Sequence, residues 1–374
     1  MTTQREVLHI TPKLNRAGVQ TLVLDLCSRL SREFNPTVLV IGDEVGALAP
    51  EFQRKDIDIH LLKTDSIQSV VADLITFLRR ESFDAVHVHD IPAFAPSLHL
   101  AARANGVEHL ICSLHGMWKF SGYKRAVTEP LWRIADPFVT AYVPVSKATK
   151  DYWVQQYGIA PEKTRVVYNG IDTSKFDPRT TTSESTEFDG EPVVGTVGSL
   201  TPVKGQSSLI KAVPSILERF PDTEVVLVGD GPLRSQLESL ARSLGVKERV
   251  RFMGTRQDIV NILSQFDVFI FPSRPTESER VAETLGIAVL EAMAMELPVI
   301  ASDTGGVSEV IQHGKSGLLI SPGDSDAIAE SVKTVLSDQS IGDKLARAGR
   351  ERVLSRFSIE KTVEAYEAVY RGDI

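Results

Sequence analysis

Short apolar runs alternate with stretches of helical periodicity along the whole chain. Apolar residues three or four positions apart mark helical stretches such as VQTLVLDLCSRL, SSLIKAVPSILERF and LRSQLESLARSLGV. The runs typical of buried strands are EVLHIT, PTVLVIG, AVHVHD and HLICSLHG in the first half and VVGTVGSL, EVVLVGDG, RVRFMG, DVFIFPS and PVIASD in the second. This alternation predicts parallel sheets covered by helices in both halves of the chain.

One segment, residues 172–192, breaks this alternation. It is rich in Ser, Thr and acidic residues and lacks apolar periodicity, which is typical of a linker. We therefore predict an α/β protein with two Rossmann-like, doubly wound domains, at 1–171 and 193–354. A helix at 355–374 follows. Periodicity does not show where it docks, and a crossing back to the first domain is one open placement. Because open α/β sheets bind ligands beyond the carboxyl ends of their strands, we expect the two domains to face each other across a binding cleft.

Composition narrows the class of protein. The 374 residues are 42% apolar and 24% charged, as in ordinary globular proteins, and the formal charge of 41 − 49 = −8 argues against a nucleic-acid binder. Cys27 and Cys112 stand in apolar surroundings, which indicates buried free thiols in a reducing compartment. The N-terminus MTTQREVLHI lacks a signal-peptide pattern, and no apolar run approaches ~20 residues. We expect a cytoplasmic protein whose membrane contact, if any, is peripheral on the inner face.

Two glutamates, Glu283 and Glu291, stand 291 − 283 = 8 positions apart at the start of the apolar helical pattern GIAVLEAMAMEL. Eight helical residues would span roughly 12 Å. The two carboxyls of a glycosidase lie about 5–9.5 Å apart on one bond, so this spacing indicates a longer ligand. The alternative is a solvated loop glutamate followed by a helix glutamate that pairs with a neighbouring base.

The helix start between these glutamates favours an anion. Gly286 allows a ligand to approach the backbone, and the amides of Gly286, Ile287 and Ala288 point out of the helix start, where a phosphate is stabilised. A nucleotide sugar offers a sugar, a diphosphate and a ribose diol in that order. We therefore interpret the segment as a donor site, with the sugar at Glu283 and the diol at Glu291.

A lysine in another loop supports this interpretation. In VGSLTPVKGQSSLI a predicted strand leads through a tight loop, with Lys204 and Gly205, into a helix. A lysine at that edge of the sheet can neutralise a leaving diphosphate. The alternative is a surface lysine in a turn.

Together these segments resemble glycosyltransferase family 4, retaining enzymes with the GT-B fold. The resemblance covers nearly the whole chain through VQTLVLDLCSRL, DAVHVHD, SLHG, VPVSKATKDY, VVYNGIDTSKF, VGSLTPVKG, LVGDGPLR, VRFMGT and ETLGIAVLEAMAMELPVIASDTGG. It implies transfer of a sugar from a nucleoside diphosphate sugar to an acceptor hydroxyl, with retention at the anomeric carbon and without a metal cofactor. It also implies same-face attack, in which a donor phosphate oxygen accepts the acceptor's proton, and a setting in polysaccharide, lipopolysaccharide or glycolipid assembly.

The resemblance implies roles for four residues near the chemistry. Glu283 and Glu291 are similar to the two glutamates of the family's E-x7-E signature, which contact the donor sugar and the ribose hydroxyls. Lys204 is similar to the family's diphosphate lysine. His115 is similar to a histidine near the reacting sugar, although a lone histidine is more often structural.

Further roles concern loops. Gly18 resembles a glycine of the first loop that lies close to the diphosphate and acceptor. That loop commonly reads G-G with a later Glu, whereas this chain has Ala17 and Gln20 there. Thr255 and Arg256 fall where the family's backbone contacts the base.

A second departure concerns charge at the diphosphate. Ser199 stands where the family's G-R-L-x-x-x-K-G pattern has an arginine, so one expected cation is missing. The loop PSRPTESERVAE before Glu283 is longer than usual and contains Arg274 and Arg280. Our hypothesis is that one of these two arginines supplies the missing charge.

The sequence indicates the acceptor less clearly than the donor. The stretch GMWKFSGYKRAVTEPLWR, residues 116–133, mixes aromatic residues with lysines and arginines. This mixture favours an anionic membrane surface or a lipid-linked acceptor, and a helix with ordinary core aromatics is an equal alternative. The sequence does not specify the donor nucleotide, the sugar, the acceptor, the linkage or the oligomeric state.

Three other functions fit parts of the pattern. A dinucleotide-dependent dehydrogenase needs G-x-G-x-x-G after an early strand, which TPKLNRAGVQ lacks. A two-domain sugar-binding protein shares the cleft but normally carries an export signal. A nucleotide-sugar 2-epimerase of GT-B fold stays open as an enzymatic alternative.

Overall fold

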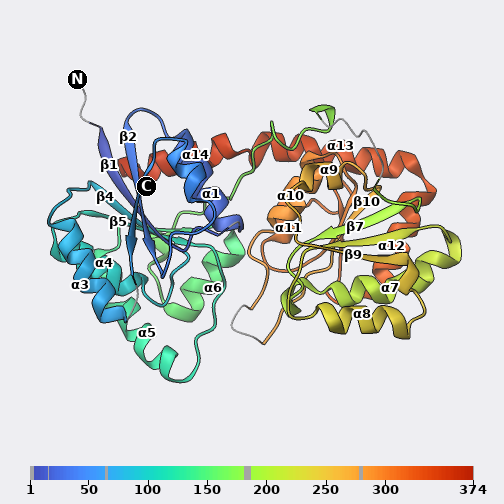
Figure 1. The fold of residues 1–374 in the computed structure, drawn as a ribbon, viewed down its shortest axis with the longest axis horizontal. Helices are drawn as coiled ribbons and strands as arrows, with labels where there is room; N and C mark the ends of the chain where they lie inside the picture. Colours follow the sequence, from blue (N-terminus) through green and yellow to red (C-terminus); the bar gives the residue numbers. More distant parts are fainter. Residues whose placement is uncertain (1–3, 16, 64–65, 181–186, 278–280, 374) are drawn as a thin grey trace. The chain divides into compact units, whose positions relative to one another are not determined.

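The computed structural model describes residues 4–15, 17–63, 66–180, 187–277 and 281–373 (Figure 1). The chain forms two compact units, residues 1–169 with 359–374 and residues 170–358. The chain therefore enters the second unit after Asn169 and returns to the first after Ser358.

The first unit contains a parallel six-stranded sheet in the order β3-β2-β1-β4-β5-β6. Its strands are β1 (Arg5–Pro12), β2 (Phe34–Ile41), β3 (Asp58–Leu62), β4 (Ala85–His89), β5 (His109–Leu114) and β6 (Ala141–Pro144). Its helices are α1 (Gly18–Arg29), α2 (Ala49–Gln53), α3 (Ile67–Leu78), α4 (Ala95–Ala104), α5 (Gly122–Ala135), α6 (Lys147–Tyr157) and α14 (Ile359–Arg371).

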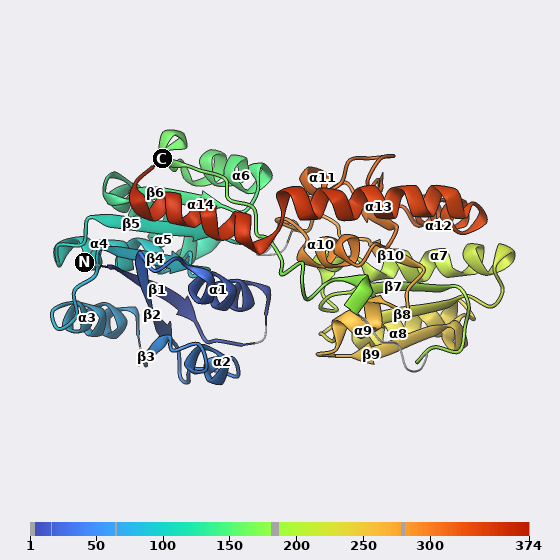
Figure 2. The same cartoon turned by 90° about the horizontal axis from the view of Figure 1, so that it is seen from above.

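Helices cover both faces of this sheet because successive strand residues point to opposite sides. Leu8 and Val86 pack with residues of α3, α4, α5 and α6 on one face. Val7 and Ala85, one position earlier in each strand, pack with α1 and α14 on the other. Figures 1 and 2 show α14 beside α1, so the C-terminal helix completes the first unit although 189 residues of the second unit precede it (358 − 170 + 1).

The second unit repeats this topology. Its parallel sheet has the order β12-β11-β10-β7-β8-β9. The strands are β7 (Val193–Val197), β8 (Glu224–Val228), β9 (Val250–Gly254), β10 (Val268–Phe271), β11 (Val299–Ser302) and β12 (Leu318–Ile320). The helices are α7 (Gln206–Arg219), α8 (Arg234–Ser243), α9 (Ile259–Leu263), α10 (Ile287–Ala294), α11 (Val307–Val310), α12 (Ser325–Ser337) and α13 (Gln339–Arg356).

Both sheets have the strand order of a Rossmann-like, doubly wound fold, so the predicted α/β class with two such sheets is confirmed. In this order the connections reverse direction between β1 and β4 in the first unit and between β7 and β10 in the second. Loops that follow the two strands at such a point open a crevice in which ligands bind. The residues after β7 and β10 are therefore the first place to look for a site in the second unit.

Helix α10 is shorter than the pattern GIAVLEAMAMEL predicts. It ends at Ala294, and the amides of Glu296 and Leu297 donate back to the carbonyls of Met293 (3.1 Å) and Ala292 (3.1 Å). Glu296 has a φ of 58°, so the helix closes in a Schellman motif before it reaches Pro298.

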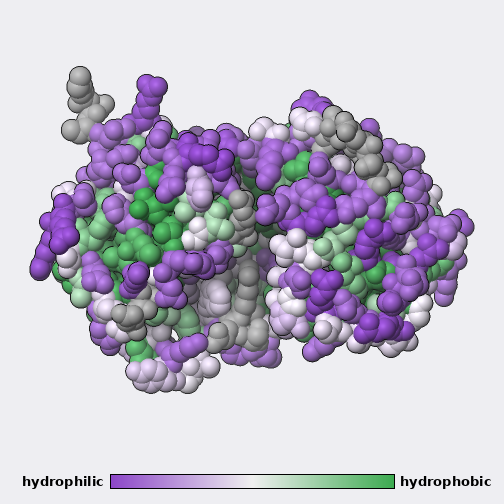
Figure 3. All heavy atoms as spheres, viewed as in Figure 1, coloured by the Kyte–Doolittle hydropathy of each residue, from purple (hydrophilic) through white to green (hydrophobic). Residues whose placement is uncertain are grey.

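No helix of the described residues combines the length and apolar character needed to cross a bilayer. Figure 3 shows hydrophilic residues over most of the visible face, with hydrophobic residues scattered among them.

Candidate functional site

The loop after β7 brings Lys204 to the point where the strand order reverses. Gly205 has a φ of 63°, and a Cβ atom on it would lie 2.0 Å from the carbonyl oxygen of Pro272, which follows β10. The amide of Arg274 donates to the carbonyl of Val203 at 2.9 Å. A glycine at 205 thus allows the loop after β7 to pack directly on the chain after β10.

This packing brings Lys204 and Glu283 together. The Lys204 Nζ lies 2.7 Å from the Glu283 Oε2 and 4.9 Å from the centroid of the Phe271 ring. The two side chains are 16% and 5% exposed, so little solvent screens the ion pair. The backbone of Glu283 is also held, since its carbonyl accepts from the amide of Gly306 at 3.2 Å. Two residues that the sequence singled out separately therefore form one buried pair.

Helix α10 begins at Ile287, four residues after Glu283. Gly286 is its N-cap, with a φ of 88°, and Val289 is the first residue whose amide donates within the helix, to the Gly286 carbonyl at 2.9 Å. The amides of Ile287 and Ala288 precede it in the first turn, where an α-helix has no internal acceptor. The first turn contains no acidic side chain, so its partial positive charge is left for a ligand anion.

Glu291 lies on the second turn of α10 in largely apolar surroundings. Burial raises the pKa of its carboxyl to about 7, and the positive charge of Lys175 opposes that rise. The carboxyl of Glu291 is therefore close to half ionised at neutral pH. Only part of the path from Glu283 to Glu291 is helical, because α10 starts at Ile287, so the 12 Å expectation for a continuous helix does not describe this segment.

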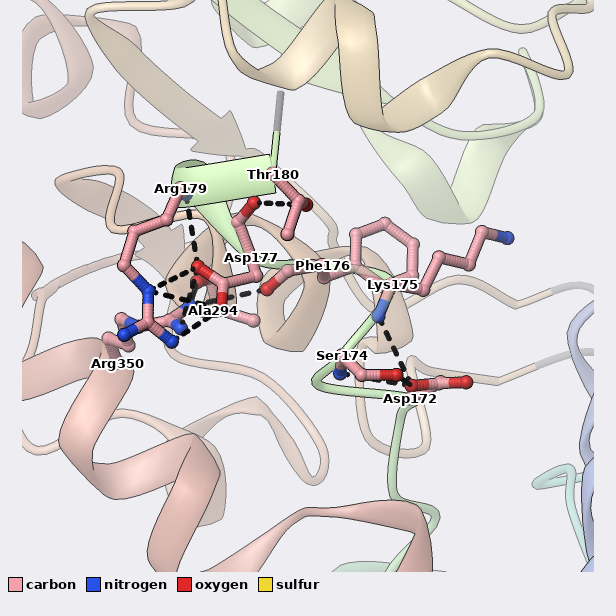
Figure 4. A network of polar contacts seen from close by, with 9 residues as sticks. All are labelled: Asp172, Ser174, Lys175, Phe176, Asp177, Arg179, Thr180, Ala294 and Arg350. Atoms are coloured by element: carbon pink, nitrogen blue, oxygen red, sulfur yellow. Dashed lines mark hydrogen bonds and ion pairs between the residues drawn. The ribbon is translucent and has the colours of Figure 1, made fainter. Parts of the chain in front are cut away.

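A network of polar contacts fixes the segment that carries Lys175 (Figure 4). The Asp172 carboxylate accepts from the amides of Ser174 (3.0 Å) and Lys175 (3.2 Å). Arg350 of α13 pairs with Asp177 at 3.2 Å. Arg350 also donates to the carbonyls of Phe176, at 3.2 Å, and of Ala294 at the end of α10. Residues 172–180 are thus tied to α10 and α13 within the second unit.

Three further residues that the sequence places near the donor diphosphate are Ser199, Arg274 and Arg280. Ser199 is exposed, and its carbonyl accepts from the Gln206 side chain at 3.0 Å. Arg274 is exposed, and its Nε donates to the carbonyl of Pro202 at 3.3 Å, so this side chain lies along the Lys204 loop. Arg280 lies outside the described residues.

Thr255 and Arg256 follow β9, the outer strand on the far side of β8 from β7. Arg256 forms ion pairs with Glu187 (2.7 Å) and Asp258 (2.5 Å), so its guanidinium is already used within the protein. Any contact with a base at this position would have to come from the backbone, as the family resemblance implies.

Gly18 and His115 belong to the first unit. Gly18 is the first residue of α1, whose N-cap Ala17 offers no side-chain cap and whose first turn contains no acidic residue. A Cβ atom on Gly18 would meet no described atom within 4 Å, so internal packing does not require glycine there. His115 follows β5 and is buried, and burial lowers its pKa to about 4, so the ring is neutral at neutral pH.

Behind His115 lies a cluster of buried histidines that the sequence analysis did not identify. His9, His87 and His89 offer ring nitrogens within 4.8 Å of one another, the one group of described residues that could hold a metal ion. Both ring nitrogens of His87 lie within hydrogen-bonding distance of hydroxyl groups, of Tyr370 (2.8 Å) and Ser113 (2.7 Å). Those hydrogen bonds satisfy His87 without an ion. The motif HVH could have indicated this cluster, since residues two positions apart on a strand lie on the same face of the sheet.

The second unit combines a Rossmann-like strand order with a buried lysine–glutamate pair at the point where that order reverses. A helix start without a side-chain cap lies beside the pair. These features are typical of a class of α/β enzymes that bind diphosphate-linked ligands. Comparison with known proteins gives the family. The model of the family Glycosyl transferases group 1 matches residues 178–352, and the model of Glycosyltransferase Family 4 matches residues 16–175. The chain belongs to this glycosyltransferase family, and it is a glycosyltransferase that uses a nucleotide-sugar donor.

Relatives show what the family does elsewhere. The chain is 32% identical to a GDP-mannose-dependent alpha-(1-6)-phosphatidylinositol monomannoside mannosyltransferase of Mycobacterium tuberculosis, over 76% of this chain and 77% of the relative. It is 27% identical to a UDP-Gal:alpha-D-GlcNAc-diphosphoundecaprenol alpha-1,3-galactosyltransferase of Escherichia coli, over 91% and 87%. The crystal structure of Anabaena HepE in complex with UDP has the same GT-B fold, with a TM-score of 0.83, 22% identity and coverage of 98% and 99%.

Proposed function

We propose that the second unit holds the donor with its diphosphate between Lys204 and the start of α10, its sugar at Glu283 and its ribose diol at Glu291. The observation that carries this proposal is the buried ion pair of Lys204 and Glu283 beside the uncapped helix start. An ammonium group has three N–H donors, so Lys204 can bind Glu283 and a phosphate oxygen together. Glu283 then fixes where the lysine charge lies.

The reaction follows from where charge develops. The bond between the anomeric carbon and the diphosphate oxygen breaks, and the acceptor oxygen forms a new bond to that carbon on the same face. The acceptor's proton passes to a phosphate oxygen of the leaving group, as the family resemblance implies. Lys204 and the α10 amides stabilise the charge on the leaving diphosphate, which lowers the barrier.

We propose that Arg274 supplies the second cation at the diphosphate, in place of the arginine that Ser199 replaces. Its side chain lies along the Lys204 loop, which supports this role. Removing the charge in Arg274→Ala should raise the donor KM, and Arg280→Ala is the parallel test of the other candidate. Unchanged donor kinetics in both variants, with Lys204→Ala inactive, would refute the compensation.

The acceptor is the less defined half of the reaction, and we propose a lipid-linked glycan at an anionic membrane surface. On α5, the apolar residues Tyr123, Val127, Pro130 and Ile134 recur every three or four positions and are all exposed, Tyr123 by 83% and Ile134 by 55%. This stripe therefore follows one solvent-facing side of the helix. The inner side of α5 buries Thr128, Trp132 and Ala135.

Basic residues border the exposed stripe. Lys119, Lys124, Arg125 and Arg133 are exposed, and Arg125 and Arg133 share the carboxylate of Glu129 at 3.0 and 3.2 Å. An apolar stripe edged by cations suits the interface of an anionic bilayer. The two relatives support this setting, since their names give phosphatidylinositol monomannoside and diphosphoundecaprenol acceptors.

Two measurements test the donor proposal. A thermal-shift screen across nucleotide sugars should raise the melting temperature for the correct donor, because that donor binds only the folded protein. Incubation with the same donors, with nucleoside diphosphate release and epimer formation followed together, separates a transferase from an epimerase. An epimer formed without acceptor would assign the epimerase alternative.

Vesicle flotation tests the membrane proposal. The protein should float at low salt with vesicles that contain phosphatidylglycerol and stay unbound with phosphatidylcholine alone. Tyr123→Ser combined with Ile134→Ser should weaken binding at least about tenfold, because two apolar side chains no longer enter the interface. Leu354→Ser on α13, 42% exposed, is the matched control and should bind as the wild type does. Equal binding by all three proteins would remove this surface from the proposal.

A further inference from the structure

The segment that joins His115 to helix α5 has no helix or strand of its own. Strand β5 ends at Leu114, and α5 begins at Gly122. Residues 116–121 lie between them, and we call them the link. They connect the histidine that the family resemblance places near the reacting sugar to the helix with the proposed membrane surface. A segment without ladder hydrogen bonds is ordinarily among the first parts of a fold to open, so the contacts that hold the link bear on the position of His115.

Two tyrosines of α6 hold the backbone of the link. The hydroxyls of Tyr152 and Tyr157 both donate to the carbonyl of Trp118, at 2.8 and 2.7 Å. A carbonyl oxygen has two lone pairs, so it can accept both hydrogen bonds. The Tyr157 hydroxyl also accepts from the amide of Phe120 at 3.2 Å. Helix α6 thus binds the link at two positions through its tyrosine hydroxyls.

A tryptophan of α6 contacts both the start of the link and the helix beyond it. The Trp153 Nε1 donates to the carbonyl of Gly116, the residue after His115, at 2.8 Å. The Trp153 ring lies 5.4 Å, between centroids, from the ring of Trp132 on the inner side of α5. Both tryptophans are 1% exposed. Trp153 therefore ties α5 and the first residue of the link to the same helix.

The side chains of the link pack inward as well. Trp118 and Phe120 pack against the apolar core of the first unit, and the Phe120 ring meets the Tyr157 ring edge-on, with centroids 5.7 Å apart. A Cβ atom on Gly116 would lie 2.2 Å from the Trp118 Nε1. Glycine at 116 therefore allows the Trp118 ring to fold back over the chain beside His115.

Helix α6 is itself well fixed. The Ser146 side chain caps its start by accepting from the amide of Thr149 at 3.1 Å, and Gly158, with a φ of 65°, ends it. The rings of Trp153 and Tyr157, four positions apart on one side of the helix, lie 4.6 Å apart between centroids. The aromatic residues that hold the link thus come from one capped helix.

We propose that Tyr152, Trp153 and Tyr157 are positioning residues that fix His115 relative to α5, so that an acceptor held at the membrane surface meets His115 in one geometry. None of the three has to touch a substrate. Their effect on turnover rests on the proposed function, whereas their effect on the link does not. Because the donor is assigned to the second unit, loss of the two hydroxyls should lower turnover without weakening donor binding.

The direct test is how readily the link opens in the ligand-free full-length protein. The indole nitrogens of Trp118, in the link, and of Trp132, on α5, are both buried, so their hydrogens exchange with solvent only when their surroundings open. In Tyr152→Phe combined with Tyr157→Phe, the Trp118 indole should exchange at least about tenfold faster, because the link loses three hydrogen bonds. The Trp132 indole should exchange as in the wild type. Magnetic resonance measures both rates, and an unchanged Trp118 rate or an equal rise at Trp132 would overturn the proposal.

Single variants make the test specific. Tyr152→Phe leaves the Trp118 carbonyl one of its two hydrogen bonds, so it should speed exchange less than the double variant does. Tyr142→Phe is the matched control, since Tyr142 is buried in the same unit and its hydroxyl donates to Asp136, outside the link, at 3.0 Å. A Trp118 rate in this control as high as in the double variant would contradict the proposal. If the double variant does not fold, Tyr157→Phe decides, because it removes two of the three hydrogen bonds by itself.

Kinetics separate positioning from simple damage. For nucleoside diphosphate release from the donor found by thermal shift, the kcat of the double variant should fall at least about fivefold, with a donor KM within about twofold of the wild type. Tyr142→Phe should keep both values. A wild-type kcat in a double variant whose link opens faster would contradict the proposal, as would an equal loss in Tyr142→Phe. If the exchange rates are as expected but the wild type turns over no donor, the proposed function fails and the fixing of the link by α6 stands.

Discussion

At the scale of the residue, Lys204 and Glu283 form one buried ion pair, which we propose acts as a unit. A lysine with no carboxylate beside it would move with the diphosphate, whereas Lys204 is held at 2.7 Å from Glu283 and over the Phe271 ring. The pair fixes a positive charge before the donor arrives, and such preorganisation is what makes charge stabilisation effective in a transition state.

We expect Lys204→Ala to lower turnover severely but measurably, and Glu283→Ala to lower kcat more than it raises the donor KM. The double variant should lose little beyond Lys204→Ala alone, because either change disrupts the same pair, with a coupling of about 0.5–3 kcal/mol. Steady-state kinetics of the three variants give this coupling, with Lys211→Ala, an exposed lysine of α7, as control. Strictly additive effects would show that the two side chains act independently.

The raised pKa of Glu291 predicts that the affinity for the donor depends on pH. Its pKa of about 7 means that the carboxyl gains charge between about pH 6 and 8, and an ionised carboxylate accepts two hydrogen bonds from a ribose diol. The affinity for an intact nucleotide sugar should therefore rise with pH across this range, by up to about tenfold per unit below the pKa. Calorimetric titration at several pH values measures it, and Glu291→Gln should bind more weakly with no such rise. A pH dependence that persists in Glu291→Gln would assign it to another group.

The sequence was enough to single out these residues, but it did not indicate which residues they contact. Residue type and local spacing were enough to single out Lys204, Glu283 and Glu291, because glycines and helix starts are local features. The pair of Lys204 and Glu283 joins residues 79 positions apart, and Lys175, which affects the charge of Glu291, stands in a segment that reads as a linker. Long-range packing decides such contacts, and composition does not encode it.

At the scale of the element, the segment 172–180 is a brace for α10. Arg350 of α13 binds Asp177, Phe176 and the carbonyl of Ala294, so one guanidinium joins the segment to the end of the helix that carries Glu291. The Arg350 and Asp177 side chains are both largely buried, so removal of Arg350 leaves Asp177 with the exposed Arg179 as its charge partner.

Arg350→Met should therefore lower the melting temperature, by roughly 2–4 °C for each kcal/mol of stability lost in a unit of this size, and raise the donor KM, since Glu291 and Lys175 lose their support. Arg347→Met is the matched control, because Arg347 lies on the exposed side of the same helix. Differential scanning calorimetry with and without donor measures both effects. A variant as stable as the control would show that the brace is dispensable.

Elements were predicted where their apolar runs were long. Strand β12, with three residues, was not among the predicted runs because so short an apolar run gives little periodicity. Strand β6 was not among them either, although β10 and β11, with four residues like β6, were predicted. Helix α10 is shorter than predicted because its Schellman motif requires a left-handed backbone at Glu296. A glutamate at this position does not indicate such a conformation. The return of α14 to the first unit was one open placement from the sequence and is confirmed, but periodicity alone could not select it, since an apolar helix side fits any exposed sheet face.

At the scale of the whole molecule, buried neutral histidines make the first unit sensitive to acid. Burial lowers the pKa of His9 to about 3 and of His99 and His115 to about 4, and it lowers those of His87 and His89 as well. The unfolded chain takes up these protons near pH 6.5, whereas the folded unit does not. The unfolded state thus binds more protons between about pH 6.5 and 4, and stability falls as the pH falls through that window.

The expected slope is about 1.4 kcal/mol per pH unit for each histidine that stays neutral in the fold. Urea unfolding at several pH values measures it. All three tryptophans, Trp118, Trp132 and Trp153, lie in the first unit, so their fluorescence reports that unit alone. His99→Gln should reduce the slope by about one histidine. A stability that does not change between about pH 7 and 5 would contradict the burial of these rings.

The return of α14 to the first unit has a consequence for synthesis. On the ribosome, the sheet of the first unit leaves the exit tunnel with Val7, Ala85 and Ile111 covered by α1 alone, because Tyr366 and Tyr370 are translated only after the entire second unit. The nascent chain must therefore keep this apolar face from aggregating until α14 has emerged. A premature stop codon that removes only α14 would leave a nearly full-length product permanently in that state.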